Sequence, residues 1–232
     1  MRHPGAGRRI LVVSGLAAEA RIAAGDGILT CAAPPAALAA RLQAIDPADL
    51  HGVVSFGLCG GLVPAMRAGD LVLASAVLDR GVTYPCDQAA ADRLGVRWAG
   101  SAMGGAPLHR GAMATAGEPV LTVANKRRLS EALGAVAVDT ESHLAARFAA
   151  EHGLPFVVLR AVSDTADRPL PPLAIRAISP DGRLDLRAIA EELTRRPRQL
   201  ALLPGLARDT ARAMATLRRV RGLLGPGLGL LV

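Results

Sequence analysis

The sequence predicts a single α/β domain in which helices cover a buried sheet. Apolar runs alternate with Ala-rich amphipathic stretches along most of the 232 residues, an order typical of α/β folds. The apolar runs lack internal polar alternation, so the strands are expected to be buried on both faces. A chain of this length suits one domain that buries roughly 70% of its unfolded surface. We expect that domain to span residues 1–232.

Each element is predicted from its own run of residues. Strands are predicted at the short apolar runs Ile10–Ser14, Gly52–Gly57, Asp70–Leu78, Ala135–Val138 and Phe156–Val162. Helices are predicted at the Ala-rich stretches Ala17–Ala24, Pro35–Ile45, Thr122–Leu133, Glu141–Glu151 and Leu186–Arg195. A basic amphipathic segment follows from about residue 204 to 232. Its arginines suit either a solvated helix face or a contact with an anionic membrane surface.

Composition limits the core, the partners and the compartment. Hydrophobic residues make up 51% of the chain and aromatic residues only 2%, so Ala, Val and Leu must fill the core. The net charge of +7 would suit nucleic acid, but aromatic stacking platforms are almost absent, and the sequence has no zinc, helix-turn-helix or RNP-type signature. Lys126 is the only lysine. We expect no nucleic-acid partner, and much of the arginine content is typical of GC-rich coding.

Three cysteines, Cys31, Cys59 and Cys86, lack metal-ligand spacing and fit small core positions in a reducing compartment. No metal site and no cofactor are expected. The first apolar run, Ile10–Val13, is too short for a signal peptide or a spanning helix. The expected location is the cytoplasm, with the inner membrane as a peripheral alternative.

Polar residues stand where the predicted strands end, which is where α/β sheets bind ligands. Each has a structural interpretation. A carboxylate at Glu19 would favour the dipole of the helix that begins there, and Asp164 could cap the start of the next helix. The glycines of Ser55–Gly61 are typical of a tight strand-to-loop turn. Arg160 lies inside an apolar run and needs an acidic partner, which a neighbouring strand end can supply. Each of these positions has a functional interpretation beside the structural one.

Their conjunction points to one chemistry. Glu19, a glycine turn, Glu141 and Asp164 all fall at strand ends of one predicted sheet. Cleavage of a glycosidic bond uses such a set, because one acid protonates the leaving group while carboxylates stabilise the cationic sugar and direct the nucleophile. Asp164, just past a strand, is the candidate proton donor.

The same motifs resemble a known family. They are SGLAAE at Ser14–Glu19, FGLCGGL at Phe56–Leu62 with GDLV at Gly69–Val72, VDTE at Val138–Glu141, and PFVVLRAVSDTAD at Pro155–Asp167. In order and spacing, from about residue 10 to 168, they closely resemble the purine nucleoside phosphorylase and methylthioadenosine/S-adenosylhomocysteine nucleosidase superfamily. The resemblance implies a three-layer α/β/α fold around a central mixed, partly barrel-like sheet, and a homo-oligomer.

The resemblance also implies roles for the matching acids. Asp164 would be the general acid that protonates N7 of a purine, with Ser163 orienting its carboxylate. Glu141 would bind the ribose 2′-hydroxyl. Glu19 would activate a water molecule.

Further positions would line the substrate. The stretch Glu118–Val120 would border the base, and backbone amides at Gly57 and Leu58 would hold an oxyanion or a sugar hydroxyl. Thr140 replaces a methionine that usually packs against sugar and base, which leaves room for a bulkier 5′ group.

The expected nucleophile is inferred from two positions at which this sequence differs from the phosphorylases. Phosphorylases of the bacterial purine type bind phosphate with an arginine two residues before the glycine of the turn and a serine just after it. Those positions here are Ser55 and Leu58. Hydrolysis is the more economical mechanism, and inorganic phosphate stays an alternative co-substrate, with Arg21 as one arginine able to rebuild its site.

The substrate is suggested by wording within the motifs. GLAAEARIA, SFGLCGGL and LRAVSDTADRPLPP resemble most closely the members associated with bacterial hopanoid biosynthesis. This implies release of adenine from adenosylhopane, a lipid-linked nucleoside, and a use for the basic C-terminal segment at a membrane. Alternatives are a methylthioadenosine/S-adenosylhomocysteine nucleosidase, a general purine nucleoside phosphorylase, and a non-catalytic nucleoside- or lipid-binding module.

Overall fold

The computed structural model describes residues 9–101, 106–176, 178, 179, 181–225, 228 and 230. Within them, eight strands form one mixed sheet in the order β2-β1-β3-β7-β6-β4-β5, and β8 pairs with both β3 and β4. The strands β3, β7, β6, β4 and β8 therefore close into a barrel that β1 and β2 extend. Their bounds are β1 Arg9–Ser14, β2 Ile28–Ala32, β3 Leu50–Gly61, β4 Leu71–Asp79, β5 Val82–Pro85, β6 Leu108–Thr115, β7 Ala137–Asp139 and β8 Phe156–Asp164.

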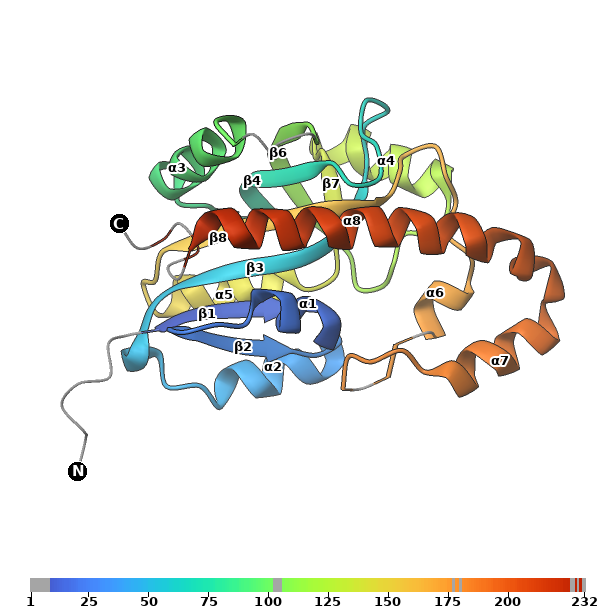
Figure 1. The fold of residues 1–232 in the computed structure, drawn as a ribbon, viewed down its shortest axis with the longest axis horizontal. Helices are drawn as coiled ribbons and strands as arrows, with labels where there is room; N and C mark the ends of the chain where they lie inside the picture. The colour runs from blue at the N-terminus through green and yellow to red at the C-terminus, as the bar shows by residue number, and fades with distance from the viewer. Residues whose placement is uncertain are drawn as a thin grey trace.

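Helices pack on both sides of this sheet (Figure 1). The α-helices are α1 Ala17–Ala23, α2 Pro35–Gln43, α3 Gln88–Ala99, α4 Val123–Leu133, α5 Ser142–Glu151, α6 Leu173–Arg176, α7 Leu186–Arg195 and α8 Leu203–Leu224, with short 3₁₀ turns at Pro47–Asp49 and Pro197–Leu202. Core residues of α2 and α5 cluster on one face of the sheet, and those of α1, α3 and α8 cluster on the other. The predicted three-layer fold with a mixed, partly barrel-like sheet is confirmed.

Successive residues of the central strands enter opposite clusters. Leu11 and Val13 of β1 pack with α2 and α5, whereas Ile10 and Val12 pack with α1 and α8. Burial on both faces explains why these strands are unbroken apolar runs in the sequence. The three cysteines are buried free thiols, as expected.

The glycine-rich stretch after Gly57 is not a turn, and that prediction is wrong. β3 continues to Gly61, and its last residues pair with β8 on one edge and with β7 on the other. One strand has to pair along both edges for the barrel to close. The lack of side chains at Gly57, Gly60 and Gly61 makes room beside this stretch, as described below.

The predicted basic segment begins as a 22-residue helix, α8, that lies across one face of the sheet (Figure 1, red). Its apolar side is buried in the core through Ala213, Leu217, Val220 and Leu224. The core therefore uses the apolar side of this helix, and contact of the basic segment with a membrane stays a prediction. No helix of the described residues is both long enough and apolar enough to cross a bilayer. Residues 226, 227, 229, 231 and 232 lie outside the described part.

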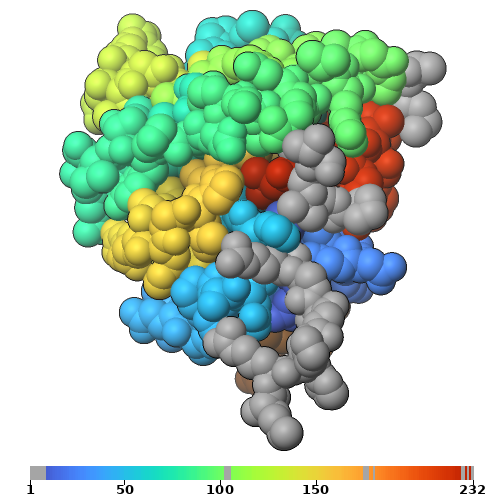
Figure 2. Space-filling model, turned by 90° about the vertical axis from the view of Figure 1, so that its left-hand side faces the viewer, coloured from blue at the N-terminus to red at the C-terminus, as the bar shows by residue number. Residues whose placement is uncertain are grey.

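Figure 2 shows the end of the molecule at which β3 and β8 begin. There the segments that precede them lie side by side, and the Val53 amide donates to the Pro155 carbonyl at 2.8 Å. Because β1, β3 and β8 are parallel, their C-terminal ends meet at the far end, on the side of α6 and α7 in Figure 1. The predicted site residues lie at that far end.

Candidate active site

Three buried carboxylates surround the last third of β3. Glu19 stands in the first turn of α1, Glu141 two residues after β7 and Asp164 at the end of β8. Only 2%, 8% and 5% of their respective surfaces are exposed. Each carboxylate lies against a glycine, since a Cβ on Gly57, Gly15 or Gly60 would fall 2.6–3.0 Å from Glu19, Glu141 or Asp164, respectively. The glycines thus admit the protein's own acids.

The Glu19 carboxylate is held by backbone amides. Its Oε1 accepts from the Leu58 amide at 2.8 Å and its Oε2 from the Leu16 amide at 2.9 Å. Burial raises the pKa of Glu19, and the Arg160 guanidinium and the amides oppose that rise. Gly57 and Leu58, predicted to contact the ligand, here contact this carboxylate.

Glu141 is held from two sides. The Thr140 hydroxyl donates to Oε1, and an Arg160 Nη1 atom lies 3.5 Å from Oε2. Burial raises the pKa of Glu141 to about 7; the guanidinium counteracts the rise, and neighbouring carboxylates add to it. Thr140 therefore does more than leave space at the position of the expected methionine. Its hydroxyl also orients Glu141, the residue predicted to bind the ribose.

Arg160 has the acidic partners that its place in a strand predicted. Its Nη2 lies 2.9 Å from Asp139 Oδ2 and donates to Ser55 Oγ at 2.7 Å, while Nη1 donates to the Leu58 carbonyl at 3.2 Å. The charge is fully buried, so these contacts replace most of its hydration, while Nε has no hydrogen-bond partner among the described residues. The predicted need for an acidic partner is confirmed.

Glu141 and Asp164 lie close to the same strand, β3, although they stand at or just past the ends of strands that run in opposite directions. β7 is antiparallel to β3, and Val138 pairs with Gly60. Glu141 therefore approaches the site from the direction opposite to Asp164. The convergence depends on the length of β3, which extends past the end of β7.

Asp164 is paired with a residue that the sequence reasoning missed. Oδ2 accepts from Lys126 Nζ at 2.5 Å, and Oδ1 accepts from the Ser163 hydroxyl at 3.0 Å. Ser163 also lies 3.3 Å from the Cys59 carbonyl of β3. A signal was available, since Lys126 is the only lysine among many arginines.

A cavity of about 250 Å³ opens beside Ser163 and Asp164. Its remaining walls are mostly apolar and come from the loop after β8, from the end of the 3₁₀ turn Pro197–Leu202 and from the start of α8. They are Pro169, Leu170, Pro171, Ala201, Leu202, Gly205 and Leu206, with Arg168 and Asp209. Val120, predicted to border the base, is half-buried against Leu62 and Val138 and is not part of this lining. The loop that carries Val120 is nevertheless close, because the Leu170 amide donates to the Leu121 carbonyl at 2.9 Å.

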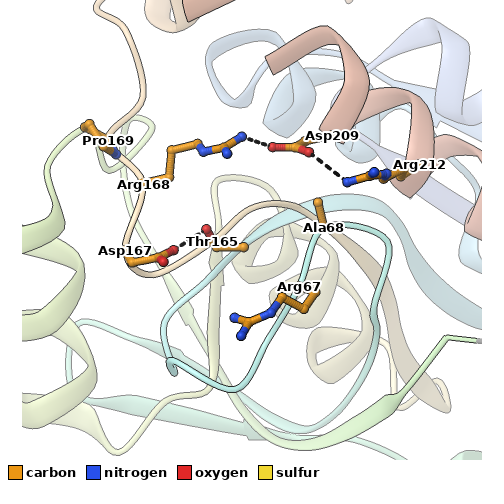
Figure 3. A pocket seen from close by; sticks show the side chains of 8 residues that line it. All are labelled: Arg67, Ala68, Thr165, Asp167, Arg168, Pro169, Asp209 and Arg212. Carbon is orange, nitrogen blue, oxygen red and sulfur yellow. Dashed lines mark hydrogen bonds and ion pairs between the residues drawn. The ribbon is translucent and has the colours of Figure 1, made fainter. Parts of the chain in front are cut away.

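A second cavity, of about 340 Å³, lies beyond the ion pair of Arg168 and Asp209 (Figure 3). Arg212 also points toward Asp209, at 3.5 Å, and Arg67 stands apart from that cluster. None of the predicted site residues lines this larger cavity. The smaller cavity is the one adjacent to the candidate acid.

The model of the phosphorylase superfamily matches residues 3–195. The chain belongs to that superfamily. Membership confirms the prediction of an enzyme that cleaves a glycosidic bond. None of the curated proteins matches the chain.

Solved structures of superfamily members share the fold. A methylthioadenosine/S-adenosylhomocysteine nucleosidase from Helicobacter pylori is 15% identical, with a TM-score of 0.64 over 93% of this chain and 98% of that one. A futalosine hydrolase from the same organism is 14% identical, with a TM-score of 0.63 over 92% and 97%. A nucleosidase from Streptococcus pneumoniae is 14% identical, with a TM-score of 0.62 over 93% and 99%.

Glu141→Gln is expected to make stability less dependent on pH. The folded protein keeps the Glu141 proton up to about pH 7, whereas the ordinary value is 4.5. The bound proton therefore stabilises the folded state fully below the unfolded pKa of 4.5. This stabilisation is lost as pH rises through the folded pKa of about 7. Glutamine does not titrate, so the Tm of the variant minus that of the wild type should increase between about pH 5 and pH 8.

Thermal unfolding followed by circular dichroism at several pH values measures this difference. Glu151→Gln, at an exposed glutamate at the end of α5, the helix that follows Glu141, is the control for removal of a carboxyl group. A flat difference for Glu141→Gln would contradict the raised pKa.

Proposed function

We propose that the protein hydrolyses the N-glycosidic bond of an adenosine derivative and releases adenine. Water is proposed as the nucleophile, rather than phosphate, because of the way in which the Glu19 carboxylate is bound. Its two carboxylate oxygens occupy the amides of Leu16 and Leu58, which would otherwise be donors for an anion. Phosphate would have to displace a buried carboxylate from them. Ser55, at the phosphorylase arginine position, is engaged with Arg160 and Ser142.

The three acids have separate roles in this mechanism. Asp164 gives a proton to N7 of the base as the electron pair of the glycosidic bond passes to the ring. Glu141 accepts a hydrogen bond from the ribose 2′-hydroxyl, and Glu19 takes a proton from the attacking water. The sugar becomes positively charged in the transition state, and an ionised carboxylate beside it would stabilise that charge.

The cavity beside Asp164 is our candidate for the base. Leu170, Leu202 and Leu206 give it apolar walls, and apolar walls suit a planar purine in a chain with few aromatic rings. Asp164 and Ser163 supply its polar end. A base bound there would meet the proton donor directly.

For the substrate, we propose adenosylhopane. The support is the wording of three motifs, which resemble members associated with hopanoid biosynthesis, and the small Thr140 beside Glu141. Methylthioadenosine and S-adenosylhomocysteine are the second candidates, because solved nucleosidases for these compounds share the fold over nearly the whole chain.

A substrate screen tests the reaction and the nucleophile together. The protein is incubated with adenosine, methylthioadenosine, S-adenosylhomocysteine and adenosylhopane, each with and without phosphate, and free adenine is measured. We expect adenine and free sugar at equal rates in both buffers, with ¹⁸O from labelled water in the sugar. A sugar 1-phosphate would establish phosphorolysis instead. Absence of adenine from every substrate would favour the binding module.

A further inference from the structure

Lys126 is fully buried, and its ammonium is saturated by three acceptors. Nζ donates to Asp164 Oδ2 at 2.5 Å, to the Thr165 carbonyl at 2.7 Å and to the Arg168 carbonyl at 2.9 Å. An ammonium has three protons, so each is assigned to one acceptor. The side chain of α4 thereby joins the candidate acid to the loop that follows β8.

This arrangement leaves the carboxylate of Asp164 without the proton that its proposed role requires. An ion pair is formed with an ionised carboxylate, and Ser163 donates to the other oxygen of the same group. Both contacts stabilise the anion. A proton for the departing base must therefore reach Asp164 from a neighbour, and Lys126 is the neighbour in contact.

Resting on the proposed function, we propose that Lys126 is a positioning residue that also supplies Asp164 with the proton for the leaving base. As the glycosidic bond breaks and its electron pair moves to the purine, N7 takes a proton from Asp164. Asp164 takes one from Lys126, which becomes a neutral amine. The base leaves as the neutral N–H form and the carboxylate is unchanged. Glu19 holds the proton taken from water; after the products leave, Glu19 gives up that proton to solvent and Lys126 takes one up through Asp164, so both groups return to their starting state.

The choice of residue fits this role. Arginine is the usual cation in this chain, and a guanidinium would also neutralise Asp164. Arginine does not give up a proton inside a protein, whereas lysine does. The one lysine of the sequence thus stands at the position where a transferable proton is needed.

Two substrates with the same ribose separate proton supply from structure. Adenosine needs a proton on its base, whereas 4-nitrophenyl β-D-ribofuranoside loses a stable phenolate that needs none. Lys126→Met and Lys126→Arg should both lower kcat on adenosine by about 10²–10⁴, the usual contribution of a general acid. Their kcat on the nitrophenyl riboside should fall less than about tenfold, which also shows that the variants fold. Arg127→Met, at an exposed position of the same helix, should change neither rate.

Each outcome has one meaning. Equal losses on both substrates in Lys126→Met and Lys126→Arg would overturn the proposal in favour of a structural ion pair. Wild-type turnover of adenosine by Lys126→Arg would overturn it as well, because charge alone would then suffice. If the wild type releases no adenine from any substrate, the proposed function fails. If Asp164→Asn cleaves adenosine normally, the roles of both Asp164 and Lys126 fail while the function stands; if Asp164→Asn is inactive and Lys126→Arg is active, only the role of Lys126 fails.

Discussion

Asp164→Asn is expected to lower kcat for adenine release by about 10²–10⁴. The amide keeps the shape of the side chain and an oxygen for Lys126, but it has no acidic proton to give to the base. The ammonium of Lys126 loses its counter-charge and keeps its two carbonyl acceptors, so we also expect a lower Tm with folding retained at 25 °C. Turnover of adenosine at 25 °C, with far-UV circular dichroism of the same sample, measures both effects.

Asp167→Asn is the matched control, because Asp167 lies exposed on the loop that follows β8, three residues after Asp164. Its turnover should equal that of the wild type. Retained adenine release by Asp164→Asn would remove Asp164 from the mechanism, and the base would then have to leave by another route.

Arg160→Met is expected to destabilise the fold by about 3–5 kcal/mol. The substitution leaves Asp139 and Glu141 buried without their cation, and it removes a donor from Ser55. Such a loss is a large share of the roughly 5–15 kcal/mol that stabilises a typical domain. Because protonation of Glu141 relieves part of the repulsion, the deficit should shrink as pH falls below about 7.

Urea unfolding measured at pH 5.5 and pH 8 tests this expectation. Arg21→Met serves as the control, since Arg21 is exposed and donates to the Ala17 carbonyl of its own helix. A change in unfolding free energy of less than about 0.5 kcal/mol for Arg160→Met would mean that the buried acids are neutral without the guanidinium.

The strands that the sequence predicted are those buried on both faces, because only they are continuous apolar runs. β6 was missed because it carries His109 and Arg110. In the fold, His109 binds Asp70 at 2.8 Å and Arg110 binds Asp92 at 2.6 Å. Distant partners satisfy these polar groups, and the local sequence does not identify them. α3 was missed despite a recognisable cap, in which the Asp87 side chain accepts from the Ala90 amide.

The sequence predicted the acidic residues of the candidate site, but it did not predict which residues pair with them. Glu19, Glu141 and Asp164 stand at the ends of readable elements, so the motifs located them. Lys126 reaches Asp164 from a helix 38 residues earlier in the chain, and that pairing depends on how α4 packs. The glycines of β3 were singled out for ligand approach, yet the space beside them is filled by carboxylates, which only the closed barrel reveals.

The place of α8 in the chain has a consequence for synthesis on the ribosome. The sheet is complete once β8 has been made, but one of its faces is covered by a helix that ends 60 residues later, at Leu224. At a translation rate of roughly 5–20 residues per second, several seconds pass before α8 can pack against Ile10, Val12 and Leu159. The nascent chain therefore exposes an apolar sheet face during that interval, and we expect it to depend on chaperones at that stage more than a domain whose core closes early.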